Sequence, residues 1–300
     1  MGLFKSKPSP PPPPPSPAFS NEWRRTPWGQ KEEMLQKLKD YVPGNPQVKT
    51  IRIFLHGPAG AGKSSFINSI NNIFQDKCMN IALADNSFAG ASFTRKYETH
   101  KIVKEKPGTY YPFLFYDVMG LENGIDKGVD EADIVKALKG HVKEGYMFNP
   151  ASPLEEENEY YVKAPTPSDT VHCLVSAIPA DKLPMMNANK NDETNDIFKK
   201  MRTIRLAASY IGIPQMVILT KVDSACPLVR EDLKKVYLSK YIKKKMEQCS
   251  NELGVPVNCI LPVKNYHEEI DLDDDMDVLL LRALRQMVDF AEGFKLSQAD

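Results

Sequence analysis

A glycine-rich run has the composition and spacing that bind phosphate. It matches G-x-x-x-x-G-K-[ST] and consists of Gly57, Pro58, Ala59, Gly60, Ala61, Gly62, Lys63, Ser64 and Ser65. In this pattern, backbone N–H groups and the positive end of the following helix hold two or three phosphates, while the lysine adds a charge for the β and γ oxygens. Ser64 would ligate Mg²⁺. The sequence therefore predicts a P-loop, and a glycine-rich turn that only packs is the structural alternative.

Two further motifs follow predicted strands later in the chain. Asp117 and Gly120 form a DxxG, in which the carboxylate would hold Mg²⁺ through water and the glycine N–H can bond the γ-phosphate. Thr220, Lys221 and Asp223 form a variant of the [NT]KxD motif. A carboxylate accepts hydrogen bonds from N1–H and the 2-amino group of guanine, a donor pair that adenine lacks. Asp223 would therefore select the base and Lys221 would lie along its ring; a capping or turn aspartate is the alternative.

Weaker signals come from two other segments. Thr94 lies in a polar stretch before a predicted strand, where GTPases keep a switch threonine that closes on Mg²⁺ and the γ-phosphate, and Ser92 is its rival. The predicted metal ligands are therefore Ser64, Thr94 and Asp117. Lys264 follows the last predicted strand, in the place of the loop whose backbone N–H meets the guanine oxygen. The usual Ser-Ala-Lys of that loop is absent, and Lys264 is the only residue that matches it.

The residues between the motifs alternate between strand-length apolar runs and amphipathic stretches. Strands are expected at 51–56, 96–104, 110–117, 170–178, 215–219 and 257–261, and helices at 63–74, near 131–139, and at 194–211, 228–249 and 276–293. This alternation predicts an α/β, P-loop GTPase-like fold, with a mostly parallel sheet and helices on both faces. The expected organisation is a disordered proline-rich arm at 1–18, a helical extension at 19–46, the P-loop GTPase-like domain at 47–293 and a flexible tail at 294–300.

Composition narrows the class of protein. The 39 Lys and Arg residues balance 39 Asp and Glu residues, which argues against a dedicated nucleic-acid binder. Neither a membrane-length apolar stretch nor a secretory signal is visible, so a cytoplasmic location is expected. The five cysteines are an odd number without a CxxC pair and are expected to be reduced, with Cys173 and Cys259 filling apolar strands. The aspartates between 271 and 277 lack the glycine and glutamate of a calcium loop, so they are expected to begin the last helix.

The N-terminus carries two signals of its own. The run Pro8–Pro17 is expected to form a polyproline II arm that an SH3 or WW-type partner could bind, and a stiff spacer is the alternative. Ahead of it, residues 1–6 match the M-G-x-x-x-[ST] pattern for N-myristoylation. Membrane binding is expected only if Gly2 is acylated, and a single acyl chain would anchor marginally and reversibly.

The motifs, taken in order, resemble the interferon-induced protein 44 family. The phrases that carry the resemblance are IRIFLHGPAGAGKSSFINSI, SFTRKYETHKI, FYDVMGLE, ILTKVD and LPVKNY, in a version typical of fish, and the likeness covers about residues 20–293. The resemblance implies a cytoplasmic, interferon-inducible, GTP-binding protein of innate antiviral defence. Longer members of the family carry a TLDc domain ahead of the GTPase-like part. In this sequence, a proline arm and a short helix occupy that place.

The sequence does not identify a catalytic residue. In signalling GTPases, the residue after DxxG is often a Gln that orients the attacking water, and here it is Leu121. The leading interpretation is a slow GTPase or nucleotide-dependent switch that uses GTP or GDP with Mg²⁺. One alternative is a catalytically idle GTP-binding interaction protein. The other is an ATP-using P-loop enzyme, which is disfavoured because the Asp223 carboxylate matches the donor pair of guanine.

Overall fold

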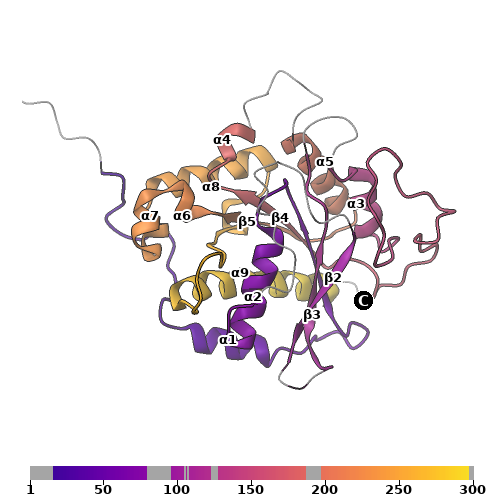
Figure 1. Ribbon diagram of the computed structural model, residues 1–300, viewed down its shortest axis with the longest axis horizontal. Coiled ribbons are helices and arrows are strands. Elements are labelled where there is room, and N and C mark those ends of the chain that lie inside the picture. The colour runs from indigo at the N-terminus through magenta and orange to yellow at the C-terminus, as the bar shows by residue number, and fades with distance from the viewer. Residues whose placement is uncertain are drawn as a thin grey trace, which may run out of the picture.

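A computed structural model describes residues 16–79, 96–104, 106, 108–122, 128–186 and 197–296 of the chain (Figure 1). Its elements in chain order are α1 (Lys31–Lys39), β1 (Ile51–His56), α2 (Lys63–Gln75), β2 (Glu98–Val103), β3 (Tyr110–Asp117), α3 (Glu131–Leu138), β4 (Cys173–Pro179), α4 (Leu183–Met186), α5 (Ile197–Tyr210), β5 (Gln215–Thr220), α6 (Val222–Ala225), α7 (Pro227–Glu231), η1 (Leu233–Tyr237), α8 (Lys240–Leu253), η2 (Val257–Cys259), β6 (Ile260–Pro262) and α9 (Asp274–Leu296).

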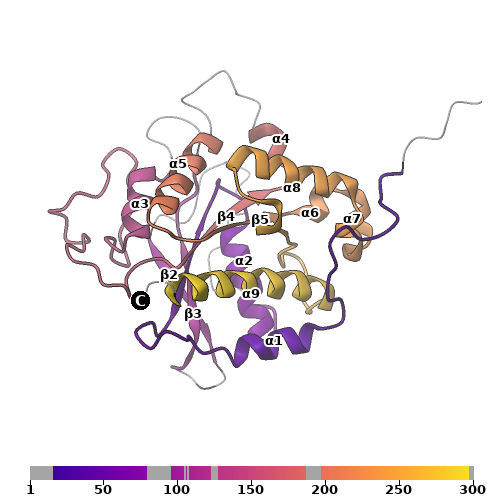
Figure 2. The same cartoon turned by 180° about the vertical axis from the view of Figure 1, so that it is seen from behind.

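The strands form one six-stranded sheet in the order β2-β3-β1-β4-β5-β6. All neighbours are parallel except β2, which pairs antiparallel with β3 at the edge. Parallel neighbours require crossover connections, and helices supply them on both sides of the sheet (Figures 1 and 2). The predicted α/β, P-loop GTPase-like fold with a mostly parallel sheet is confirmed. Because the parallel strands share a direction, the loops after β1, β3, β4, β5 and β6 all lie at the carboxyl ends of the strands, on one side of the sheet.

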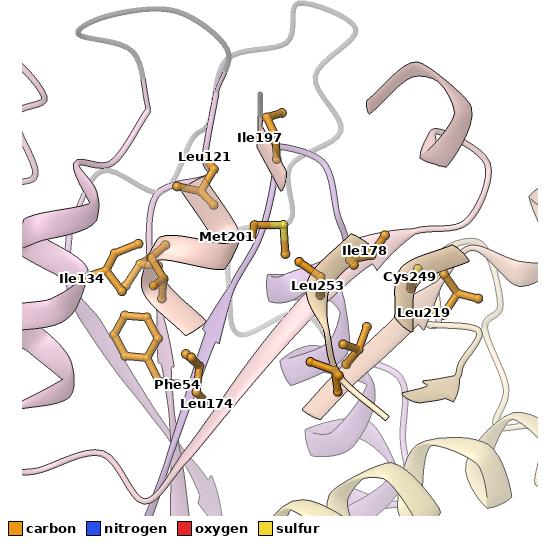
Figure 3. Close-up of a cluster of buried hydrophobic side chains, with 14 of the residues drawn as sticks. Phe54, Leu121, Ile134, Leu174, Ile178, Ile197, Met201, Leu219, Cys249 and Leu253 are labelled. Atoms are coloured by element: carbon orange, nitrogen blue, oxygen red, sulfur yellow. The ribbon is translucent and has the colours of Figure 1, made fainter. Parts of the chain in front are cut away.

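Two apolar clusters fill the two faces of the sheet. Along β1, Ile51, Ile53 and Leu55 point to the cluster beneath α1, α2 and α9, while Phe54 points to the cluster beneath α3, α5 and α8. Figure 3 shows part of this second cluster. The five parallel strands are therefore buried on both sides, which explains why their sequences are near-continuous apolar runs. The antiparallel edge strand β2 differs, because only Ile102 of its six residues is buried.

Some element boundaries differ from the expected ones. The helix expected at 228–249 is three pieces, α7, η1 and α8, because the backbone is extended at Asp232 and at Ser239. The strand expected at 257–261 is a 3₁₀ turn followed by the short strand β6, so Cys259 lies in the turn while Cys173 lies in β4. All five cysteines are free thiols. Among the helices of the described residues, none is both long and apolar enough to cross a membrane.

Candidate nucleotide-binding site

The glycine-rich run forms a tight loop between β1 and α2. Gly57 has φ +144°, and a Cβ there would lie 2.2 Å from the Ala177 carbonyl oxygen of β4, so the neighbouring strand leaves no room for a side chain. Lys63 begins α2, and its Nζ donates to the carbonyl oxygens of Gly57 and Pro58 at 3.5 and 3.3 Å. The lysine is therefore folded back over the loop, with its ammonium above the place where phosphates bind in a P-loop.

Asp117 ends β3 beside this loop, because β3 pairs in parallel with β1 and brings Asp117 opposite Leu55. The Ser64 hydroxyl donates to Oδ2 of Asp117. Oδ1 is buried and has no hydrogen-bond partner among the described residues. Burial raises the pKa of this carboxyl, and the nearby Lys63 ammonium and the Ser64 hydroxyl oppose the rise. A hydroxyl and a carboxylate with an unpaired oxygen are hard oxygen donors of the kind that Mg²⁺ prefers.

The DxxG segment lies directly on the glycine-rich loop. The Leu121 N–H donates to the Gly57 carbonyl at 2.9 Å, and the Ala59 N–H donates to the Leu121 carbonyl at 3.2 Å. A Cβ on Gly120 would lie 2.6 Å from the Ala59 backbone, so only glycine allows this approach. The Leu121 side chain is fully buried and belongs to the apolar cluster that also contains Ile134 and Met201 (Figure 3).

The three residues of the TKVD motif have different surroundings. Thr220 is fully buried at the end of β5, and its hydroxyl donates to the Ala61 carbonyl at 2.7 Å, so it braces the glycine-rich loop. Lys221 adopts φ +55°, which turns the chain into α6. The Asp223 carboxylate makes no hydrogen bond or ion pair within the described parts of the chain; its backbone carbonyl accepts from Arg230 Nε at 3.3 Å.

One cavity of about 400 Å³ joins the loop after β5 to the start of α2. Its walls are Gly62, Ser65, Asp181, Lys221, Asp223, Ser224, Lys264, Asn265, Tyr266, His267, Glu268 and Glu269. The first two residues belong to the phosphate-binding motif, while Lys221 and Asp223 belong to the motif predicted to read the base. The structure therefore brings the two predicted ends of a nucleotide site to the same cavity.

Lys264 lies on this cavity but is held by a neighbour. Its Nζ is 2.7 Å from Oε1 of Glu269, whose Oε2 also accepts from the His267 and Glu268 N–H groups at 2.9 and 3.2 Å. Burial of Glu269 works against ionisation, but these hydrogen bonds and the Lys264 charge dominate and lower its pKa to about 2. The carboxylate therefore organises the loop after β6, and the Lys264 ammonium is part of that arrangement.

Sequence reasoning missed a residue that joins this loop to the phosphate end. Asn265 donates from Nδ2 to the Gly62 carbonyl at 3.0 Å. Its place directly after Lys264 was the only available signal. Asp181, after β4, also lines the cavity and belongs to no motif. Thr94 and Ser92, the two predicted switch residues, lie outside the described residues, as do Gly2 and the first part of the Pro8–Pro17 run.

The fold and this arrangement define a P-loop GTPase-like α/β protein. Among solved structures, the chain is similar to one described as a probable GTP-binding protein engB, with a TM-score of 0.42 and 11% identity over 81% of this chain and 98% of that one. No family model matches the sequence.

Comparison with curated proteins gives the family. The chain is 32% identical over 264 residues to the interferon-induced protein 44 of Homo sapiens, which is 88% of this chain and 57% of that protein. It is 31% identical over 261 residues to the Mus musculus protein of the same name, covering 87% of this chain and 59% of that protein. The chain belongs to the interferon-induced protein 44 family and spans a little over half the length of these relatives.

Proposed function

We propose that this chain binds GTP and GDP with Mg²⁺ and acts as a nucleotide-dependent switch or slow GTPase. We further propose that it is an interferon-inducible cytoplasmic protein of the innate antiviral response, which rests on its family and on the relatives' printed name. The observation that carries the nucleotide proposal is the cavity that joins Gly62 and Ser65 to Lys221 and Asp223.

Each part of the site has a role in this proposal. The glycine-rich loop and Lys63 bind the phosphates, and the N-terminus of α2 adds the positive end of a helix. Ser64 and Asp117 would hold Mg²⁺, which neutralises charge on the β and γ oxygens when bound. The Asp223 carboxylate, which has no protein partner in the described parts of the chain, would accept from N1–H and the 2-amino group of guanine.

Two alternatives stay open. The burial of Leu121 favours a catalytically idle GTP-binding protein, since the side chain after DxxG has no polar atom that could orient water. In an ATP-using enzyme, the Asp223 carboxylate would face adenine, which lacks the N1–H and 2-amino donors of guanine. This mismatch disfavours the ATP alternative.

Competition calorimetry with GTP, GDP and ATP tests the nucleotide proposal. GTP and GDP are expected to bind at least about fivefold more tightly than ATP, because one unmatched polar contact is worth about 1 to 3 kcal/mol. Equal binding of ATP and GTP would contradict the base assignment. Lys63→Ala is expected to weaken GTP and GDP alike, whereas Lys49→Ala, at an exposed lysine just before β1, should change neither.

Asp223→Asn separates base recognition from phosphate binding. The amide can donate where the carboxylate accepts, so guanine affinity should fall while binding of xanthosine diphosphate, which carries an oxygen at position 2, should rise. A variant that loses guanine and xanthine nucleotides equally would mean that Asp223 supports the fold and does not read the base.

A further inference from the structure

Tyr266 lies on the wall of the cavity and makes hydrogen bonds in two directions. Its backbone N–H donates to Ser69 Oγ at 2.9 Å, and the Ser69 hydroxyl donates to the Ser65 carbonyl at 2.7 Å. Ser65 is in the first turn of α2 and also lines the cavity. The loop after β6 is therefore attached to the helix that begins at the phosphate end, through a residue that is only 8% exposed.

The phenol of Tyr266 points away from α2 toward α9. Its hydroxyl donates to Asp277 Oδ1 at 2.6 Å and accepts from the Asp273 N–H at 2.7 Å. Asp277 is fully buried, and burial raises the pKa of its carboxyl. A buried carboxylate needs a cation or several donors to stay ionised, because desolvation disfavours its charge.

That cation comes from α1, a helix that precedes the sheet in sequence and packs along α9 (Figures 1 and 2). Lys31 Nζ is 2.8 Å from Asp277 Oδ2 and 3.0 Å from Asp274 Oδ1. Burial of the lysine opposes its charge, but the two carboxylates dominate and raise the pKa of Lys31 above its ordinary value. Lys31, Asp277, Tyr266 and Ser69 thus form one continuous polar chain from α1 to the cavity.

We propose that Lys31 is a positioning residue for the nucleotide site, acting through Asp277 and Tyr266 on the loop after β6. The inference rests on the proposed nucleotide binding. Lys31 does not line the cavity, so its effect on a bound nucleotide passes through Tyr266, which does. Such coupling is reciprocal: bound nucleotide stabilises the contact between α1 and α9 by the same factor by which that contact stabilises the nucleotide.

The test uses the full chain and a fluorescent GDP analogue with Mg²⁺. Lys31→Met is expected to speed nucleotide dissociation about 5- to 20-fold, within the usual range of coupling between sites. Lys31→Arg keeps the charge and should restore most of the unmodified rate. Lys37→Met is the matched control, since Lys37 is on the same helix in an exposed pair with Glu33 at 2.6 Å. It should change the rate by less than about twofold.

A double-mutant cycle separates positioning from general loss of stability. Tyr266→Phe should speed dissociation, and adding Lys31→Met should then change the rate by less than about twofold. Independent, multiplying effects of the two substitutions would overturn the proposal. If the unmodified protein does not bind the analogue, the proposed function fails instead. If it binds and Lys31→Met releases nucleotide no faster than Lys37→Met does, only the positioning role fails.

Hydrogen exchange of the unmodified protein covers the case in which Lys31→Met does not fold. Saturating GDP should slow amide exchange in residues 31–39, because bound nucleotide strengthens the contact that holds α1. Unchanged exchange in α1, with slower exchange in residues 57–65 as proof of binding, would overturn the proposal.

Discussion

Among single residues of the motifs, some line the cavity and others form hydrogen bonds that fix the backbone of neighbouring loops. Asp223 and Lys221 line the cavity, whereas Thr220 turns inward to brace the Ala61 carbonyl. Lys264 lines the cavity but is paired with Glu269. A motif specifies residue types and their spacing. It does not reveal which hydroxyl or ammonium group already forms a hydrogen bond or ion pair with another residue of the protein. The loop organised by Glu269 could not be predicted for that reason.

Leu121 leads to a prediction about turnover. Its backbone N–H and carbonyl are both hydrogen-bonded to the glycine-rich loop, and its side chain is buried in the cluster of Figure 3. Single-turnover GTP hydrolysis by the isolated protein is therefore expected to be slow, with half-lives of minutes or longer, on the order of intrinsic small-GTPase rates. The measurement is phosphate release after rapid mixing with Mg²⁺ and GTP.

Leu121→Gln sharpens this prediction. The substitution would bury an amide in an apolar cluster and should lower stability by about 2 kcal/mol or more, without raising the hydrolysis rate. Turnover of several per second by the unmodified protein would require a catalytic group outside the glycine-rich loop, the DxxG segment and the TKVD motif. An acceleration by Leu121→Gln would mean that the side chain leaves the cluster when nucleotide binds.

At the scale of elements, the regular α/β pattern was predictable and its interruptions were not. The strands β1, β3 and β5 and the helix α2 begin and end within one residue of their expected limits, because buried parallel strands and a helix after a P-loop have strong signatures. The stretch 228–249 has continuous helical spacing, yet it breaks where side chains of Asp232 and Ser239 accept hydrogen bonds from the next turn. These capping residues compete with an uninterrupted helix.

The aspartates before α9 illustrate the same limit. Asp273 caps the helix by accepting from the Asp275 and Met276 N–H groups at 3.0 and 2.9 Å, in keeping with the expected role of this run. Asp277 has a different role, since it is buried between Tyr266 and Lys31. Its long-range partners are 11 residues before it and 246 residues before it in the chain, which local pattern cannot reveal.

The cap of α8 gives a prediction at this scale. Ser239 is buried, and its Oγ accepts from the Ile242 N–H at 3.2 Å. Ser239→Ala should lower the free energy of unfolding by about 1 to 2 kcal/mol, because the first turn of the helix loses its acceptor. Chemical denaturation measures the change. Ser250→Ala, inside the same helix, is the control and should stay within about 0.5 kcal/mol of the unmodified protein; equal losses in both would contradict the cap.

In the molecule as a whole, the candidate site residues lie together at the carboxyl ends of the parallel strands. The loops that follow β1 and β6 bring residues 203 positions apart into hydrogen-bonding contact, namely Gly62 and Asn265. Parallel topology makes this meeting predictable from motif order alone. The acylation of Gly2, the partner of the proline run and the switch role of Thr94 stay predictions from the sequence.

Two buried histidines, at opposite ends of neighbouring strands, predict how stability depends on pH. His56 ends β1 next to the glycine-rich loop, and His172 precedes β4 and accepts from the Arg52 N–H at 3.2 Å. Burial, together with the charge of Lys63, lowers the pKa of His56 to about 3. Burial, with the charges of Lys295 and Arg52, lowers the pKa of His172 to about 3 as well. Both side chains are therefore neutral in the folded protein at pH 5.

The unfolded chain takes up a proton at each histidine near pH 6.5, while the folded protein does not until about pH 3, so stability is lost as the pH falls through this window. The two histidines together should lower the free energy of unfolding by about 2 kcal/mol between pH 6 and pH 5. Chemical denaturation at both pH values gives this difference, and His56→Gln and His172→Gln should each remove about half of it. The imidazole resonances of His56 and His172 in the unmodified protein, followed by NMR, should not titrate above pH 5. Titration of His56 near pH 6 in the folded state would mean that solvent reaches the space beneath the glycine-rich loop.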